Sequence, residues 1–139
     1  MSLNTDCIFC KIIAGEIPAT KIFESDSALA FMDISPIATG HCLVIPKNHY
    51  VTLDEMPASQ AGEFLSALPA IIKAVQRATC CEGVNILQNN GKAAGQEVPH
   101  VHVHIIPRLP GEDFHFNWPA KSGDTAQITD LAQKIKAQL

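Results

Sequence analysis

The sequence predicts an α+β domain with an antiparallel sheet, and three observations favour this class. Short strand-like segments are separated by hairpin-length connections that contain Gly, Pro, Asn, Asp or Ser, which is typical of antiparallel pairing. Two amphipathic segments, 57–79 and one beginning at Asp124, predict two main helices. The chain has 139 residues, which suits one compact domain, so we expect a single domain over 1–139.

The N-terminal third predicts a short helix followed by a three-stranded meander. The run "CIFCKIIA" at 7–14 fits a short helix that ends at Gly15, with Pro18 shortly after it. Alternating apolar residues between turn signals then predict three strands, at 20–26, 28–34 and 41–46.

The rest of the chain predicts a long helix, two strands and a final helix. Apolar residues recur at three- and four-residue steps over 57–79, and Pro69 inside this stretch predicts a kink there. The segments 83–91 and 100–107 read as strands that end in turn residues. A last helix is expected to start at Asp124, with Gln127 placed as in a capping box.

Composition excludes several classes of protein. The formal net charge is −4 and the ten Lys and Arg residues are scattered, which argues against general nucleic-acid binding. There is no run of 18 apolar residues and no basic segment followed by an apolar one, so we expect no membrane span and a cytoplasmic location. Five cysteines without an export signal indicate reduced thiols, with Cys42, Cys80 and Cys81 in packing roles.

The stretch "PHVHVHIIPR" at 99–108 carries the strongest chemical signal. In an extended strand His100, His102 and His104 share one face, while the apolar residues between them face the core. Same-face neighbours lie roughly 6.6 to 7 Å apart, so three such rings can hardly share one zinc ion. At least one ring is therefore free for nucleophilic or acid-base chemistry, and phosphoryl transfer fits a row of imidazoles. The alternative is that the three histidines form only the polar outer face of a strand and have no chemical role.

The run "HVHVHII" at 100–106 matches the signature His-φ-His-φ-His-φ-φ, where φ is apolar, of the histidine triad (HIT) superfamily. The segments "CIFCKIIAGEIPATKIFESD", "ALAFMDISPIATGHCLVIPKNH" and "GQEVPHVHVHIIPR" resemble its Hint-like branch, in its prokaryotic zinc-containing form. The resemblance implies a HIT-like fold with a five-stranded antiparallel sheet and two main helices, a core at 7–108 and a C-terminal extension at 109–139. It also implies a homodimer with paired sheets.

The resemblance further implies a nucleotide hydrolase or transferase that acts at the α-phosphate of nucleoside phosphoramidates or dinucleoside polyphosphates. His102 would attack phosphorus to give a nucleotidyl-histidine, which water then cleaves, and His104 would contact the phosphate. His41 and Gln96 complete the implied catalytic set. The expected substrate is a purine nucleotide, with adenine as the favoured base and no organic cofactor.

The family's nucleotide-binding positions also have counterparts here, although each residue has a simpler alternative reading. The resemblance assigns four apolar residues to the base, one carboxylate to the ribose, and four loop residues to the phosphate side, namely Phe9, Ile12, Phe31 and Ile34; Asp33; and Asn89, Gly95, Gln96 and Val98. Without the family, the aromatic residues could be ordinary core, Asp33 a turn former, the amides loop caps, and His41 a strand-edge residue.

The pair "CIFC" at 7–10 has the spacing of a metal knuckle or a redox pair, and by itself it is also compatible with packing. The strand order does not offer the βαβ unit that thioredoxin-like chemistry needs. Some prokaryotic members of the family hold a structural zinc ion at positions that correspond to Cys7, Cys10, His49 and His100. The resemblance therefore implies this zinc site, and its two thiolates and two imidazoles suit tetrahedral zinc.

Two features depart from the family pattern. Glu97 stands near the leaving group, where many members carry Ser or Thr, and a carboxylate there would repel phosphate oxygens. After Pro107 the chain has Phe114, Phe116 and Trp118 at alternate positions, which predicts a strand face or an apolar patch. The Trp118–Pro119 pair resembles an element that reaches the partner subunit's site, and the helix from Asp124 could cover the core or the dimer surface.

Two rival functions remain open on the sequence. The first is a nucleotide-binding regulatory protein with vestigial catalysis, which an attempt to trap a nucleotidyl adduct would distinguish. The second is a metal-dependent hydrolase in which the histidines hold a catalytic ion, which chelation followed by an assay would distinguish.

Overall fold

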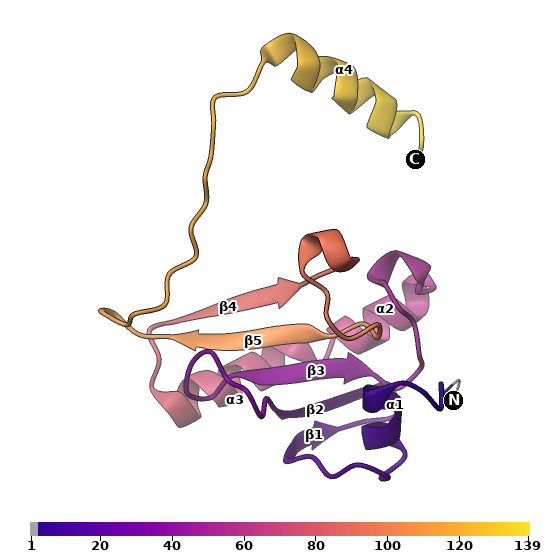
Figure 1. Cartoon of the computed structure of the whole chain (residues 1–139), viewed down its shortest axis with the longest axis vertical. Coiled ribbons are helices and arrows are strands. Elements are labelled where there is room, and N and C mark those ends of the chain that lie inside the picture. The colour runs from indigo at the N-terminus through magenta and orange to yellow at the C-terminus, as the bar shows by residue number, and fades with distance from the viewer. Residues whose placement is uncertain (1–2) are drawn as a thin grey trace.

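The computed structural model describes residues 3–139 as a five-stranded antiparallel sheet with helices on both faces and one helix held away from it (Figure 1). The strands are β1 (Lys21–Glu24), β2 (Ala28–Met32), β3 (Cys42–Pro46), β4 (Gly83–Gln88) and β5 (Val103–Arg108). Their order in the sheet is β1-β2-β3-β5-β4. The α+β class, the antiparallel sheet and the N-terminal meander predicted from the sequence are thus confirmed.

Four α-helices accompany the sheet, and their bounds are α1 (Ile8–Ile13), α2 (Ala58–Leu65), α3 (Leu68–Thr79) and α4 (Thr125–Lys136). Two 3-10 turns lie at Leu53–Glu55 and Lys92–Ala94. Among residues 3–139 there is no helix with the length and hydropathy needed to cross a membrane.

Both faces of the central strands are buried, because α1 covers one face and α3 the other (Figure 1). Along β2, Ala28 and Ala30 pack with α2 and α3, whereas Leu29 and Phe31 pack with α1. The strand β3 alternates in the same way. The period of two along each strand therefore sends alternate residues into two separate cores.

The helix expected over 57–79 is two helices, so the prediction of one kinked helix was wrong. The helix α2 ends at Leu65 and α3 begins at Leu68, with Pro69 in its first turn. Proline lacks the N–H that a helix interior needs, but the first turn has no partner for that N–H. Pro69 therefore starts a helix here.

The strand expected over 100–107 is shorter at its N-terminal end than the sequence predicts. Regular pairing of β5 begins at Val103, so of the three histidines only His104 lies in the strand. The backbone N–H of Val101 donates to the carbonyl of Tyr50 at 2.8 Å, which ties this segment to the loop after β3. The expected alternation still holds, because Val101, Val103 and Ile105 are all in the α3-side core.

The C-terminal helix begins where the sequence predicts, but it lies far from the sheet (Figure 1). The side chain of Asp124 caps α4 by accepting from the N–H of Ala126 at 2.9 Å. Phe114 and Phe116 form no strand and instead pack around Arg108.

Candidate functional site

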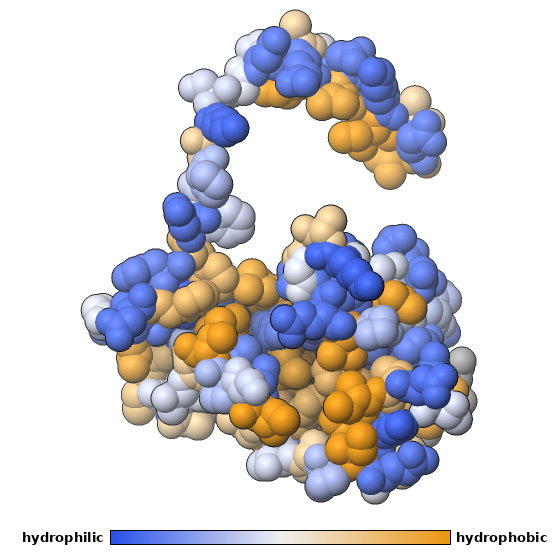
Figure 2. Space-filling view, viewed as in Figure 1, coloured by the Kyte–Doolittle hydropathy of each residue, from blue (hydrophilic) through white to orange (hydrophobic). Residues whose placement is uncertain are grey.

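A cleft of about 660 Å³ opens on the α1 side of the sheet, and it contains His102 and His104. One wall consists of apolar residues from α1, the following loop and β2, including Phe9, Ile12 and Phe31. Apolar residues are seen to gather on this face of the body in Figure 2. The cleft has the size and mixed lining that are usual for a small-molecule site.

His102 is held in one tautomer by the backbone. Its Nδ1 lies 2.7 Å from the carbonyl oxygen of His100, and a carbonyl can only accept a hydrogen bond. Nδ1 of His102 therefore carries the proton, and Nε2 of the neutral ring carries a lone pair. The ring is 6% exposed and packs edge-on against Phe9, with 5.2 Å between ring centroids. His102 thus offers an oriented nitrogen nucleophile.

His104 is oriented by a chain of hydrogen bonds that begins at the backbone of Ile37. The N–H of Ile37 donates to Nδ1 of His41 at 3.2 Å, so the neutral ring of His41 carries its proton on Nε2. Nε2 of His41 lies 2.9 Å from Nδ1 of His104, to which it donates, and 3.4 Å from Oδ2 of Asp33. Because Nδ1 of His104 accepts, the neutral ring of His104 has its proton on Nε2. A nucleophilic ring and a donor ring are therefore neighbours, with 5.0 Å between the centroids of His102 and His104.

Burial keeps these supporting rings neutral. It lowers the pKa of His104 to about 4, an effect that the neighbouring His102 and His41 rings increase and Asp33 opposes. Burial also lowers the pKa of His41, and here too the carboxylate of Asp33 opposes the shift. At neutral pH both rings therefore hold the tautomers that the hydrogen bonds require.

A second group of side chains, Cys7, Cys10, His49 and His100, lies beside the cleft, and its four ligand atoms are all within 4.8 Å of one another. Nδ1 of His100 lies 3.4 Å from Sγ of Cys7, 3.6 Å from Sγ of Cys10 and 3.2 Å from Nδ1 of His49. Nε2 of His100 lies 2.9 Å from the carbonyl of Pro46, so Nε2 donates and Nδ1 presents its lone pair to the group. Such a cluster is consistent with a structural metal site.

The two sites are linked through His100 and Phe9. The carbonyl of His100 fixes the tautomer of His102, while its ring belongs to the Cys/His cluster. Phe9 lies between the two cysteines in sequence and contacts the rings of both His100 and His102. A metal ion that holds α1 in place would therefore also hold one wall of the cleft.

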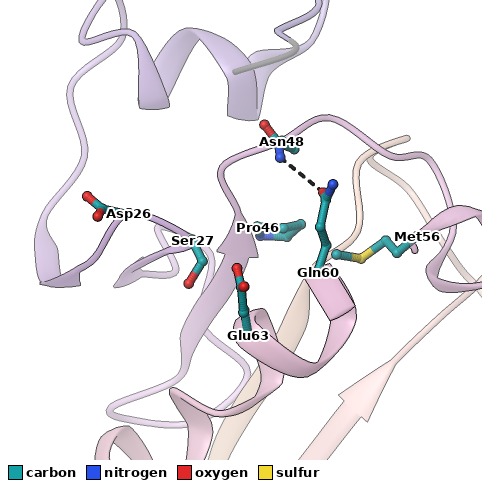
Figure 3. A pocket seen from close by; sticks show the side chains of 7 residues that line it. All are labelled: Asp26, Ser27, Pro46, Asn48, Met56, Gln60 and Glu63. Carbon is teal, nitrogen blue, oxygen red and sulfur yellow. Dashed lines mark hydrogen bonds between the residues drawn. The ribbon is translucent and has the colours of Figure 1, made fainter. Parts of the chain in front are cut away.

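A second, smaller hollow of about 100 Å³ differs in chemistry (Figure 3). Its lining comes from the β1–β2 turn, the end of β3 and α2, and it includes Ser27, Pro46 and Gln60. Asn48 donates to Oε1 of Gln60 across it at 3.0 Å. It contains neither a histidine nor a cysteine, so the larger cleft is the better candidate site.

Nearly all of the residues predicted for the nucleotide line the larger cleft, namely Phe9, Ile12, Phe31, Asp33, Ile34, Asn89, Gly95, Val98, His102 and His104. Gln96 is not among the lining residues. Its Oε1 accepts from the N–H of Gly91 at 2.7 Å, and its Nε2 donates to the carbonyls of Val51 and Val98. Gln96 thus holds its own loop together and ties it to Val51. Ile34 lines the cleft but is 94% exposed.

Several lining residues were missed from the sequence, including Leu43, Leu87 and Ile106. Leu43 and Leu87 both pair with His104 across the sheet, one from each side, so all three share a face. The alternation along each strand shows which of its own residues share a face. It does not show which residues of neighbouring strands lie opposite one another, so the pairing of Leu43 and Leu87 with His104 could not be predicted.

The chain belongs to the family described as "HIT domain", because the model of that family matches residues 14–111. It is 42% identical, over 139 residues, to an adenosine 5'-monophosphoramidase of Saccharomyces cerevisiae, and the match covers 99% of this chain and 85% of the relative. It is 49% identical, over 107 residues, to an adenylylsulfatase of Arabidopsis thaliana. That match covers 77% of this chain and only 54% of the relative, so the chain spans about half of that protein's length.

The solved structure of the Streptococcus mutans protein SMU.412c is similar to this chain throughout. The TM-score is 0.93 at 41% identity, with 97% of this chain and 86% of that chain covered. The α+β HIT fold predicted from the triad motif is thereby confirmed.

Proposed function

We propose that this protein is a nucleotide hydrolase or transferase that acts at the α-phosphate of nucleoside phosphoramidates or dinucleoside polyphosphates. The observation that carries the proposal is the hydrogen bond from Nδ1 of His102 to the carbonyl of His100, which leaves the lone pair on Nε2 of His102 free in a cleft that also contains His104. Attack on phosphorus needs such a nucleophile, and the charge on the phosphate oxygens needs a hydrogen-bond donor such as His104. The names of the yeast and plant relatives, a monophosphoramidase and an adenylylsulfatase, support a nucleotide substrate.

The proposed reaction has two steps. In the first, Nε2 of His102 forms a bond to the α-phosphorus, the bond from phosphorus to the leaving group breaks, and the leaving group departs with the bonding electrons. An amine leaving group takes up a proton from solvent as it departs, because the cleft is open. Nδ1–H of His102 remains on the carbonyl of His100 and stabilises the positive charge that develops on the ring. In the second step water attacks phosphorus and gives up a proton to solvent, the electrons of the P–N bond return to Nε2 of His102, and the nucleoside monophosphate leaves.

The nucleotide would lie along the cleft with its base against α1 and β2. Phe9, Ile12, Phe31 and Ile34 would contact the base, and adenine is our expected base. Asp33 would accept from the ribose, although its Oδ1 already accepts from the N–H of Ser35 at 2.8 Å. Asn89, Gly95 and Val98 would lie on the phosphate side, and Gln96 would act by holding that loop in place.

We also propose that the Cys/His cluster holds a structural zinc ion. Around tetrahedral zinc, with bonds of about 2.05 Å to nitrogen and 2.3 Å to sulfur, two nitrogens are about 3.3 Å apart and a nitrogen and a sulfur about 3.6 Å apart. The observed separations of 3.2 Å between the nitrogens of His49 and His100, and of 3.4 to 3.6 Å from nitrogen to sulfur, support this assignment. The ion would fix α1 to the loop that follows β3 and to the triad segment.

A catalytic metal ion at Asp33, His41 and His104 is a weaker candidate. These three residues could together hold an ion. The nitrogens of His41 and His104, however, are 2.9 Å apart, and the proton assignment makes this contact a hydrogen bond that uses both of them. The hydrogen bond therefore favours the metal-free mechanism at this position.

The proposal is tested with adenosine phosphoramidate, a diadenosine polyphosphate and the His102→Ala variant. The wild type should turn over at least one substrate, and its mass should rise transiently by one nucleotidyl group, which is a nucleoside monophosphate less one water. In His102→Ala, kcat should fall on the order of 10³-fold or more, while AMP binding measured by calorimetry remains. His115→Ala is the matched control, because His115 is exposed and does not line the cleft. Wild type that binds AMP but forms no adduct and has no turnover would instead support the vestigial, regulatory function.

We further propose that the protein is a homodimer in which the sheets of two copies pair. The strand β4 is an edge strand in the sheet, and its Ile86 is 41% exposed. A partly apolar edge is usually covered in the assembled protein, and a second copy would cover it here.

A further inference from the structure

The loop after β3 lies between the Cys/His cluster and the phosphate side of the cleft. Residues 47–53, here called the bridging segment, include His49, which belongs to the cluster. Nδ1 of His49 lies 3.2 Å from Nδ1 of His100 and 3.4 Å from Sγ of Cys10. Two residues further along the same segment, the carbonyl of Val51 contacts the loop proposed to lie beside the phosphate. One short stretch of backbone therefore contacts both sites.

The phosphate side of the cleft is formed by residues 89–98, here called the phosphate loop. Four of its residues line the cleft, namely Asn89, Gly95, Glu97 and Val98. The N–H of Gly91 donates to Oε1 of Gln96 at 2.7 Å, and the N–H of Gln96 donates to the carbonyl of Gly91 at 3.1 Å. These reciprocal hydrogen bonds close the loop into one unit, so its placement at the cleft depends on its ties to the rest of the chain.

Two side-chain amides tie the phosphate loop to the bridging segment. Nε2 of Gln96, which is 7% exposed, donates to the carbonyl of Val51 at 2.7 Å. Oδ1 of Asn90 accepts from the N–H of Leu53 at 2.8 Å. The orientation of both amides is fixed, because a backbone N–H can only donate and a carbonyl can only accept. The phosphate loop is therefore attached, near both of its ends, to the segment that carries His49.

Asn90 is held in place by the end of β4. Its Nδ2 donates to Oε1 of Gln88 at 2.8 Å, and its Oδ1 also accepts from Nε2 of Gln88 at 2.9 Å. Gln88 is the last residue of β4, so this pair joins the sheet, the phosphate loop and the bridging segment. Asn90 does not line the cleft and lies outside both cores. It can therefore affect a ligand only through the position of the loop.

The bridging segment is ordered on both sides of His49 by contacts with α2. Oε1 of Gln60 accepts from Nδ2 of Asn48 at 3.0 Å, as Figure 3 shows, and from the hydroxyl of Tyr50 at 2.9 Å. The carbonyl of Tyr50 accepts from the N–H of Val101 at 2.8 Å. An ordered, hydrogen-bonded segment transmits a shift of one residue to its neighbours, whereas a flexible loop absorbs it.

We infer that Asn90 and Gln96 are positioning residues for the nucleotide phosphate, and that they place the phosphate loop according to whether the Cys/His cluster holds a metal ion. A filled cluster fixes His49, and the two ties carry that position to the phosphate loop. By linkage, the metal ion and the phosphate group must each strengthen the binding of the other by the same factor. The inference rests on the proposed zinc and nucleotide sites and goes beyond them by joining them through residues that touch neither ligand.

A second route between the two sites runs through Phe9, which contacts the rings of His100 and His102. This route involves the wall proposed for the base and does not involve the phosphate loop. Adenosine has the base and the ribose but no phosphate, so it separates the two routes. Coupling of zinc to adenosine reports on the wall at α1, and additional coupling to AMP reports on the phosphate loop.

The inference is tested by measuring the zinc dissociation constant of the full chain, alone and with saturating adenosine or AMP. Competition with a chromophoric chelator gives this constant, with free zinc calibrated in each ligand solution. The wild type should bind zinc about five-fold more tightly with AMP than with adenosine, which is at the low end of the usual range for coupled sites.

Three variants assign this difference to the tie at Asn90. Asn90→Leu removes the acceptor for Leu53, so the five-fold difference should fall to about two-fold or less. Asn90→Asp keeps that acceptor and should keep the difference, because its added charge weakens AMP binding with and without zinc alike. Asn117→Leu makes the first exchange at an exposed position far from the loop in sequence and should keep the difference. Circular dichroism checks that each variant folds.

The outcomes separate this inference from the proposals on which it rests. If the wild type binds both zinc and AMP but shows equal zinc affinity with AMP and adenosine, the inference is refuted while both proposed sites stand. A wild-type difference in Asn90→Leu, or a loss as large in Asn117→Leu or Asn90→Asp, refutes the role of the Asn90 acceptor. A chain that binds zinc but not AMP refutes the proposed function, and the inference with it.

Discussion

His100 and His102 are two residues apart and almost equally buried, yet they belong to sites of different kinds. The ring of His100 turns its free Nδ1 toward two sulfurs and another imidazole in a closed cluster. The ring of His102 turns its free Nε2 to an open cleft, beside the donor nitrogen of His104. In each ring the other nitrogen donates to a backbone carbonyl, Pro46 for His100 and His100 for His102.

The comparison teaches that residue type alone does not assign the chemistry of a histidine. The partner of the occupied nitrogen fixes the tautomer, and the surroundings of the free nitrogen determine what it can do. Changes in the closed cluster should therefore affect metal content and stability most. Changes in the open cleft should affect protonation and catalysis.

The largest expected effect is on the closed cluster. The double variant Cys7→Ser, Cys10→Ser should lower the zinc content from one ion per chain to nearly none. It should also lower the free energy of unfolding by about 4 kcal/mol when free zinc is about 1,000-fold above its dissociation constant. Atomic absorption and urea unfolding measure the two quantities. Cys80→Ser, Cys81→Ser is the control, because neither thiol is near the cluster, and full zinc retention by the first variant would disprove the assignment.

Much of the difference between the closed cluster and the open cleft could be predicted from the sequence, because the pattern of alternating histidines and the CIFC spacing are local. The alternation placed Val101, Val103 and Ile105 in the core correctly, and the capping position of Asp124 predicted where α4 starts. The spacing of the triad also indicated that one ring would have a separate task. These features depend on chain periodicity and local hydrogen bonds, which a sequence displays directly.

The features that the sequence did not reveal depend on distant contacts. The sequence did not show that β5 begins only at Val103. Its start depends on the N–H of Val101, which donates to the carbonyl of Tyr50 in another loop. The involvement of Gln96 with Val51 is likewise a tertiary contact, between residues 45 positions apart. The exposed placement of α4 could not be predicted either, because an amphipathic pattern shows that a face needs a partner but not where that partner is.

An intermediate effect is expected on the open cleft when the pH falls. The folded-state pKa of His104 is about 4, below the ordinary value of 6.5, so the unfolded chain binds a proton between these values that the folded chain does not. The free energy of unfolding should therefore rise with pH from about 4 to about 6.5 and level off above that. Partial solvation of the cleft reduces the contribution of His104 to about 1 to 2 kcal/mol.

Urea unfolding at pH 5 and pH 7 measures this contribution when the wild type is compared with His104→Gln. Glutamine can hydrogen bond but does not titrate, so the variant should lose less stability between the two pH values. His115→Gln, in an exposed segment, should behave like the wild type. Equal losses for His104→Gln and the wild type would mean that His104 is not held neutral by its surroundings.

The smallest expected effect concerns Glu97, which is exposed but lines the open cleft. A carboxylate about 7 Å from a negatively charged leaving group in water costs on the order of 0.6 kcal/mol, or about a three-fold change in rate. Glu97→Ser should therefore raise kcat/KM for a diadenosine polyphosphate about three-fold relative to adenosine phosphoramidate, whose leaving group carries no phosphate. The change should shrink as salt is added, since exposed charges are screened.

Glu63→Ser is the matched control for Glu97, because Glu63 is exposed on α2 and faces the small hollow of Figure 3. It removes the same charge from the chain without removing it from the cleft, so the ratio of the two kcat/KM values should stay as in the wild type. An equal change in both variants would indicate that only net charge matters. No change in either would mean that Glu97 points away from the leaving group. A change confined to Glu97→Ser would show that the open cleft, unlike the closed cluster, selects substrates through charge at its rim.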